Sequence, residues 1–213
     1  AALYARPRPS GAMVDFQSRD TRRGGDTDDE DPDPEPADEP TGAAEAEESE
    51  GAGPVEGVGF AVVTVGAERT IEEDAAGNDV AGALESAGEV VTRELLDDDF
   101  DGIQRAVNAL VNRRDVDVVC TIGGTGVQPA DVTVEALSPL FDKTLPGVGE
   151  QIRYRCVEER GTAVVRTRAT GGIIDGVPTF CLPGEPVLAA TATREVVVPE
   201  AEPLAQLARL EES

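Results

Sequence analysis

A glycine cluster directly after an apolar run carries the residue types of this sequence that are best suited to chemistry. The apolar run covers residues 116–122, and the glycines that follow it are Gly123, Gly124 and Gly126. Without a Cβ, these residues allow backbone N–H groups to approach an oxyanion closely. Further donors are the hydroxyl groups of Thr121, Thr125 and Thr133. Residues 121–133 are therefore predicted to form an anion-binding loop.

Asp131 lies in the same segment and allows two interpretations. A carboxylate beside a phosphate-binding loop repels the ligand unless a divalent cation lies between them, which makes Mg²⁺ the natural candidate. Alternatively, the carboxylate accepts a hydrogen bond from the first turn of the following helix and only caps it. The residue pattern by itself favours the cap, although the two oxygens of one carboxylate can serve both roles.

Three other residues belong to segments that can reach this loop. Asp98 follows a predicted strand, within the acidic run 96–100, and either faces the loop or lies in a solvated turn. Gly184 lies in the rigid turn 183–186, and Gly147 lies in the segment 146–149. Each glycine allows the backbone to approach a ligand or belongs to an ordinary connection. Distance from the glycine cluster decides between these interpretations.

The elements that must position these residues alternate in the manner of βαβ units. Strands are expected at residues 58–65, 89–95, 116–122, 169–174 and 177–182, the last two joined by a tight turn at Asp175-Gly176. Helices are expected at residues 74–87, from Asp98 or Asp99 to about 110, at 131–137, and from 187 onward, and the segment 146–150 is expected to lead into a helix that reaches about residue 159. In a parallel sheet the glycine turn lies at the carboxyl edge, where ligands collect.

The first 57 residues differ in composition from the rest and are predicted to be a disordered acidic tail. Residues 26–50 contain 13 acidic and no basic side chains. Such a tail most simply solvates the protein, with an interaction arm as the alternative. Met13, the only methionine, is a candidate start residue. Residues 58–213 are expected to form one folded domain.

Composition excludes several classes of partner and cofactor. The chain has 43 acidic and 18 basic residues, a net charge of −25, which argues against nucleic acid and anionic membranes as partners. It has no histidine and no Cys-x-x-Cys pair, so no zinc or iron site is recognisable. Cys120, Cys156 and Cys181 are expected to be reduced core residues. With neither a signal peptide nor a long apolar run, the protein is expected to be soluble and cytoplasmic.

In this order the motifs resemble the MoaB/Mog family, the molybdopterin-binding domain of molybdenum cofactor biosynthesis, over roughly residues 57–210. Residues 121–126, Thr-Ile-Gly-Gly-Thr-Gly, correspond to the family's Thr-Thr-Gly-Gly-Thr-Gly. Residues 130–135, Ala-Asp-Val-Thr-Val-Glu, correspond to its Arg-Asp-Val-Thr-Pro-Glu. Further landmarks in register are residues 74–77, 96–98, 145–150 and 182–186.

This resemblance implies a three-layer αβα domain with a mostly parallel sheet, assembled as a homotrimer or homohexamer in the cytoplasm. Active members transfer AMP from ATP to the phosphate of molybdopterin with Mg²⁺ as cofactor. Carried over, the catalytic and metal-binding carboxylates are Asp98 and Asp131. The residues implied to contact molybdopterin or phosphate are Thr121, Gly123, Gly124, Thr125, Gly126, Thr133, Gly147 and Gly184.

Departures from the family pattern leave alternative functions open. Ala130 stands in place of an arginine and Glu185 in place of a small hydroxyl residue, and both changes are expected to weaken anion binding. Loss of one charge-assisted contact costs about 1.5–3 kcal/mol. The alternative is therefore a non-catalytic molybdopterin-binding or assembly paralogue. A third possibility, another nucleotide-binding α/β protein, lacks a Walker lysine and a Gly-x-Gly-x-x-Gly motif after its first strand.

The charge outside the tail leads to a first prediction. Without residues 26–50, 30 acidic residues remain against 18 basic ones, a net charge of −12, and Lys143 is the only lysine. This composition indicates adaptation to a salt-rich cytosol. We predict that the midpoint of thermal unfolding, measured by circular dichroism, rises from dilute buffer to molar KCl because salt screens repulsion between carboxylates. Equal midpoints would contradict the salt adaptation.

Overall fold

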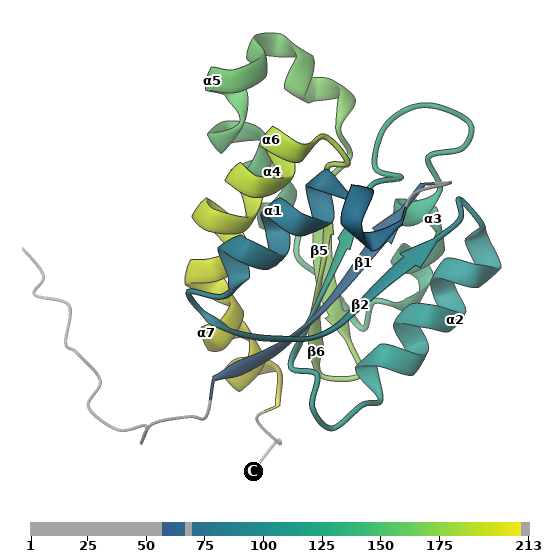
Figure 1. The fold of residues 1–213 in the computed structure, drawn as a ribbon, viewed down its shortest axis with the longest axis vertical. Coiled ribbons are helices and arrows are strands. Elements are labelled where there is room, and N and C mark those ends of the chain that lie inside the picture. Colours follow the sequence, from purple (N-terminus) through teal and green to yellow (C-terminus); the bar gives the residue numbers. More distant parts are fainter. Residues whose placement is uncertain (1–56, 67–69, 210–213) are drawn as a thin grey trace, which may run out of the picture. The chain divides into compact units, whose positions relative to one another are not determined.

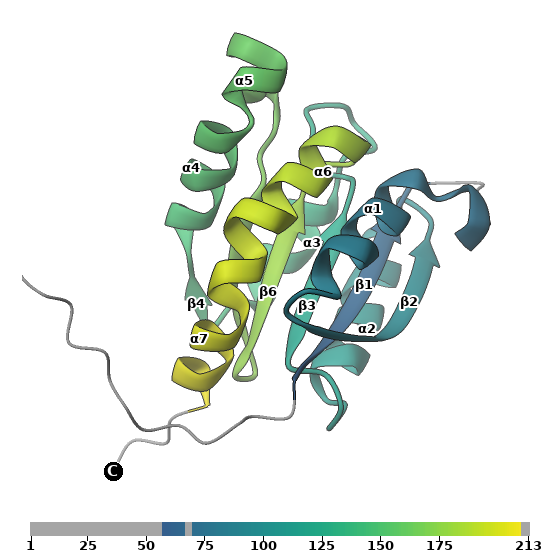
Figure 2. The same ribbon diagram turned by 60° about the vertical axis from the view of Figure 1, so that its left-hand side comes forward.

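The computed structural model describes residues 57–66 and 70–209, which form a six-stranded sheet with helices on both faces (Figures 1 and 2). The order across the sheet is β2-β1-β3-β6-β5-β4. β2, β1, β3 and β6 are parallel, whereas β5 and β4 complete the sheet through antiparallel pairings. The strands are β1 (Val58–Val65), β2 (Gly88–Leu96), β3 (Val118–Ile122), β4 (Lys143–Thr144), β5 (Thr170–Ile174) and β6 (Val177–Leu182).

Two groups of helices cover the two faces of the sheet. One face carries α1 (Ala75–Leu84), α4 (Pro146–Arg155), α6 (Pro186–Ala192) and α7 (Val198–Ala208), with α5 (Val157–Arg160) continuing from α4. The other face carries α2 (Phe100–Val111) and α3 (Thr133–Leu137). Short turns of helix are η1 (Ile71–Glu73), η2 (Ser138–Leu140), η3 (Gly161–Arg166) and a π-helical turn, η4 (Thr193–Val197). These layers confirm the predicted αβα class.

Successive side chains of the central strands point to opposite faces of the sheet, so a hydrophobic core forms on each face. All eight residues of β1 are buried. Phe60 and Val62 join the core beneath α1, α4 and α6, and Ala61 and Val63 join the core beneath α2. A strand covered on both faces requires a continuous apolar run, which is the pattern of residues 58–65.

Most predicted elements occur, with changed ends. α1 begins after Asp74, whose side chain accepts a hydrogen bond from the Gly77 N–H at 2.9 Å and caps the helix. The helix predicted to reach residue 159 is broken at Cys156 into α4 and α5. β4 was not predicted, because two residues at the sheet edge are too few to show alternation. The turn at Asp175-Gly176 is confirmed by φ angles of 47° and 76°.

Other sequence predictions lie largely outside the described residues. The acidic tail, predicted for residues 1–57, overlaps the described chain only at Gly57, and Met13 is not described. Within the described ranges, no helix combines the length and apolarity needed to span a membrane.

The three cysteines generate a second prediction. Cys120, Cys156 and Cys181 are free and buried, as expected. Burial raises the pKa of Cys156 to about 11 and that of Cys181 to about 12, and it also raises the pKa of Cys120. Because the thiolate is the reactive species, Ellman's reagent at pH 8 should modify all three thiols in guanidinium but react only slowly with the native protein. Rapid modification of any native thiol would contradict the described burial.

Candidate functional site

The loop after β3 has a backbone shape that requires glycine. Gly123 and Gly124 have φ angles of 96° and 63°. A Cβ on Gly123 would lie 2.3 Å from the carbonyl oxygen of Val65, and a Cβ on Gly124 would lie 2.1 Å from Thr133 Oγ1. A side chain at either position would therefore be strained and would displace the neighbouring chain.

Hydrogen bonds fix this loop against the neighbouring strand ends. The Gly123 N–H donates to the Leu182 carbonyl at 3.1 Å, so this N–H is not available to a ligand, contrary to expectation. Among the described residues, no hydrogen bond is donated by the N–H groups of Gly124, Thr125 or Gly126. These three groups remain as donors for an anion.

A cavity of about 490 Å³ lies at the carboxyl edge of the parallel strands. The residues that line it come from the ends of β1, β2 and β3 and from the turn before α6. Five residues predicted for the site line it, namely Asp98, Gly123, Gly124, Asp131 and Gly184. The remaining lining residues are Thr64, Val65, Gly66, Ile122 and Gln128. The described lining thus contains two carboxylates and no lysine or arginine.

Neither carboxylate of this cavity caps a helix. Asp131 Oδ2 accepts a hydrogen bond from the Gln128 N–H at 2.6 Å, whereas the N-cap of α3 is Val132, without a side-chain hydrogen bond. The interpretation of Asp131 as a helix cap is therefore wrong, because α3 begins two residues later than predicted. Asp99, not Asp98, caps α2 by accepting from the Gly102 N–H at 2.7 Å.

The two carboxylates of this cavity, Asp98 and Asp131, are enough to bind a metal ion whose other ligands come from a nucleotide. Residues 57–66 and 70–209 contain no cluster of three or more His, Cys, Asp or Glu side chains able to hold a metal. Mg²⁺, however, is commonly bound by one or two carboxylates together with substrate phosphates and water. The cavity of Asp98 and Asp131 fits that arrangement and does not fit a cage built from protein ligands alone.

The other predicted contacts lie elsewhere. Thr121 is fully buried and donates to the Phe180 carbonyl at 3.3 Å. Thr133 is fully buried beneath Gly124, and its Oγ1 has no hydrogen-bond partner among the described residues. Both residues are thus buried away from solvent, which the sequence did not indicate. Gly126 leaves room for Asp131, since a Cβ there would lie 2.5 Å from Asp131 Oδ2. A Cβ on Gly147 would meet open space, so no neighbouring part of the described chain requires that glycine.

Arg168 fixes the glycine loop from the segment before β5, and it was missed in the sequence. Its Nε donates to the Gly126 carbonyl at 2.6 Å and its Nη2 to the Asp131 carbonyl at 2.8 Å. The same guanidinium pairs with Glu135 and lowers the pKa of that carboxyl. The Arg168 N–H also donates to the Thr125 carbonyl at 2.7 Å. Nothing in the local sequence pattern distinguishes Arg168 from a surface arginine.

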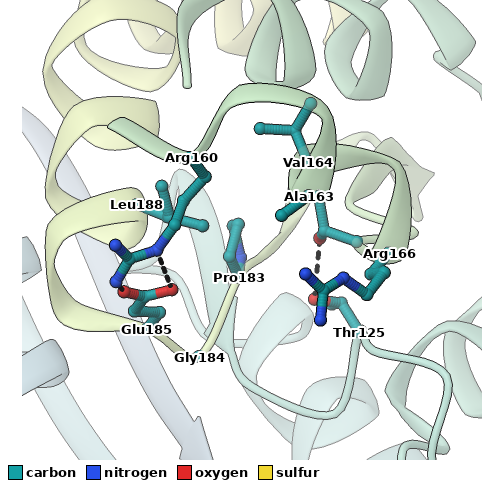
Figure 3. Close-up of a pocket in the computed structure, with 10 residues that line it drawn as sticks. Thr125, Arg160, Ala163, Val164, Arg166, Pro183, Gly184, Glu185 and Leu188 are labelled. Carbon is teal, nitrogen blue, oxygen red and sulfur yellow. Dashed lines mark hydrogen bonds and ion pairs between the residues drawn. The ribbon is translucent and has the colours of Figure 1, made fainter. Parts of the chain in front are cut away.

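A second cavity, of about 300 Å³, lies beside the loop (Figure 3). Thr125 lines it, and Gly184 lines both cavities. Glu185 also faces this space, where it forms an ion pair with Arg160. From the sequence, the negative charge of Glu185 is expected to weaken anion binding. In the structure that charge has a partner.

Comparison with known proteins identifies the family of this chain. Residues 61–203 match the family described as "Probable molybdopterin binding domain". The chain belongs to this family. It is 38% identical over 141 residues to molybdenum cofactor biosynthesis protein B of Bacillus subtilis, covering 65% of this chain and 83% of that protein. It is 40% identical over 131 residues to the molybdopterin adenylyltransferase of Pyrococcus furiosus, covering 59% and 76%.

A solved structure supports the same assignment. The tungsten cofactor synthesizing protein MoaB from Pyrococcus furiosus superimposes with a TM-score of 0.66 at 36% identity, covering 74% of this chain and 100% of that one. The chain is thus a MoaB-type member of the molybdopterin-binding domain family, in agreement with the resemblance found in its sequence.

The third prediction concerns how strongly Arg168 stabilises the glycine loop in this molybdopterin-binding domain. Arg168→Gln removes charged donors from two loop carbonyls, and such contacts contribute about 1.5 kcal/mol or more. Exchange of the hydrogen-bonded amides of this loop, those of Gly123, Gln128 and Asp131, should therefore accelerate roughly tenfold. The matched control is Arg113→Gln, which removes an exposed pair with Asp115 at the opposite sheet edge. Equal exchange rates in the two variants would contradict the role of Arg168 in fixing the loop.

Proposed function

We propose that this protein is a molybdopterin adenylyltransferase, which transfers AMP from ATP to the phosphate of molybdopterin in a Mg²⁺-dependent reaction. The observation that carries the proposal is the convergence of Asp98 and Asp131 on one cavity with the glycine loop. The name of the Pyrococcus furiosus relative, at 40% identity, supports the same activity.

Charge in this cavity explains why a cation would be required. Two carboxylates and no basic side chain line the described cavity, so the phosphates of ATP would be repelled there on their own. Asp98 and Asp131 would hold Mg²⁺, which supplies positive charge against the nucleotide phosphates when bound. The carboxylates thereby make nucleotide binding conditional on the metal.

The proposed reaction is an in-line displacement at the α-phosphorus of ATP. An oxygen of the molybdopterin phosphate forms a new bond to the α-phosphorus while the bond to the β-phosphate oxygen breaks, and pyrophosphate leaves with that electron pair. The attacking phosphate is already ionised, so no activated side chain is needed. The free N–H groups of Gly124, Thr125 and Gly126 would orient the phosphates, and positioning would supply most of the rate.

Binding of molybdopterin without turnover is the second candidate function. Ala130 favours it, because this position offers no guanidinium to the loop, and Arg168 uses its donors on loop carbonyls. Such a protein would keep the fold and the ligand but lack the charge stabilisation that the transition state requires. Homotrimeric or homohexameric assembly, and a cytoplasmic location, stay predictions for either function.

Replacement of the carboxylates gives the fourth prediction. Asp131→Asn and Asp98→Asn should each lower pyrophosphate release from molybdopterin and MgATP by about 10²- to 10³-fold, the usual effect of losing one electrostatic group. Asp97→Asn is the matched control, because Asp97 is an exposed neighbour outside the cavity lining. Release that persists in Asp131→Asn would contradict the proposal, and molybdopterin binding by the wild type without any release would favour the second candidate.

A further inference from the structure

The second cavity has apolar walls and charged groups on opposite sides. Ala163, Val164, Pro183 and Leu188 contribute the apolar walls. In Figure 3, Arg160 and Arg166 flank the cavity with Pro183 between them. Thr125 joins this cavity to the glycine loop, since its Oγ1 lies 3.3 Å from Thr167 Oγ1 in the cavity wall.

Arg160 is occupied by a carboxylate of this same chain. Its Nε donates to Glu185 Oε2 at 3.0 Å, and its Nη2 pairs with Glu185 Oε1. A guanidinium uses the same two-pronged arrangement for phosphate. The side chains of Arg160 and Glu185 are 47% and 37% exposed, and pairs with that much solvent contribute little to stability. A ligand anion can therefore compete for Arg160.

Arg166 faces the same cavity without a carboxylate of its own. Within the described part of the chain, it has no ion-pair partner. The chain reverses between the two arginines at Gly161, whose φ of 54° favours glycine and whose Cβ position is open space. Backbone geometry, not crowding, thus accounts for the glycine that separates Arg160 from Arg166.

We infer that Arg160 and Arg166 form an anion subsite for a phosphate group, and that Glu185 is an internal competitor which a bound anion displaces from Arg160. Displacement leaves Glu185 facing solvent while the guanidinium keeps an anionic partner. Glu185 then sets the affinity of the subsite and discriminates against weakly charged ligands, because only a strong anion replaces a carboxylate.

The subsite extends the proposed function. Its role in binding a substrate phosphate rests on that function. The two cavities share Gly184, so anions bound in them would be neighbours. One cavity would take phosphate together with a cation at its carboxylates, and the other would take phosphate directly at arginine. The existence of the subsite can be tested without ATP, molybdopterin or turnover.

The test, our fifth prediction, is an NMR titration of the full chain with inorganic phosphate, followed at the backbone amide of Ala163, which lines only the second cavity. Glu185→Gln should lower the Kd for phosphate about three- to tenfold, since it removes both the competitor and a nearby negative charge. Glu185 makes no side-chain cap of α6, so this change removes no helix cap. The matched control is Glu195→Gln, which frees Arg155 from a similarly exposed pair outside the cavity.

A double substitution distinguishes displacement of Glu185 from Arg160 from a general effect of removing one negative charge. If Arg160 receives the anion, the gain from Glu185→Gln disappears in the Arg160→Gln background, and Arg166→Gln alone weakens phosphate binding. The inference is overturned if Glu185→Gln binds phosphate no more tightly than Glu195→Gln, or if its gain survives without Arg160. If the wild-type protein binds phosphate as predicted but releases no pyrophosphate from molybdopterin and MgATP, the proposed reaction is wrong and the subsite stands.

Discussion

Close backbone contact at the carboxyl edge of the sheet is the constraint on which the site depends. A Cβ on Gly184 would lie 3.0 Å from the Gly123 Cα, and a Cβ on Gly123 would lie 2.3 Å from the Val65 carbonyl oxygen. Three chain segments, from the ends of β1, β3 and β6, therefore meet without side chains between them. The cavity beside this contact is lined by Asp98, from the turn after β2, and by Asp131, from the loop after β3.

Charge is divided between two adjoining cavities that share Gly184. The described lining of the first has carboxylates and no basic group, whereas that of the second has two arginines, one of them paired with Glu185. A chain with a net charge of −25 opposes phosphate at long range, so each cavity needs its own local source of positive charge. A metal ion brought with the nucleotide would serve the first cavity, and side chains would serve the second.

Local patterns predicted the strands and the glycine loop because apolar runs and glycine clusters are properties of neighbouring residues. The convergence of Asp98 with the loop followed from topology, since parallel strands end at one edge. Contacts distant in sequence could not be predicted: Arg168 bonds Gly126 across 42 positions, and Arg160 bonds Glu185 across 25. The residue pattern alone favoured a helix cap for Asp131, because an acidic residue before a helix usually is one, and the structure contradicts only that interpretation. The pairing of Glu185 with Arg160 was equally invisible, whereas the expectation that Glu185 weakens anion binding stays a prediction.

We propose that the cavity of Asp98 and Asp131 takes a divalent cation together with a nucleotide. Paramagnetic broadening by Mn²⁺ tests it most directly, in the presence and absence of a non-hydrolysable ATP analogue. We predict that low concentrations of Mn²⁺ broaden the backbone amides of residues 123–126 and of Asp98 only when the nucleotide is present, because two carboxylates alone are a weak site. Broadening that ignores the nucleotide, or that centres on another part of the chain, would contradict the account.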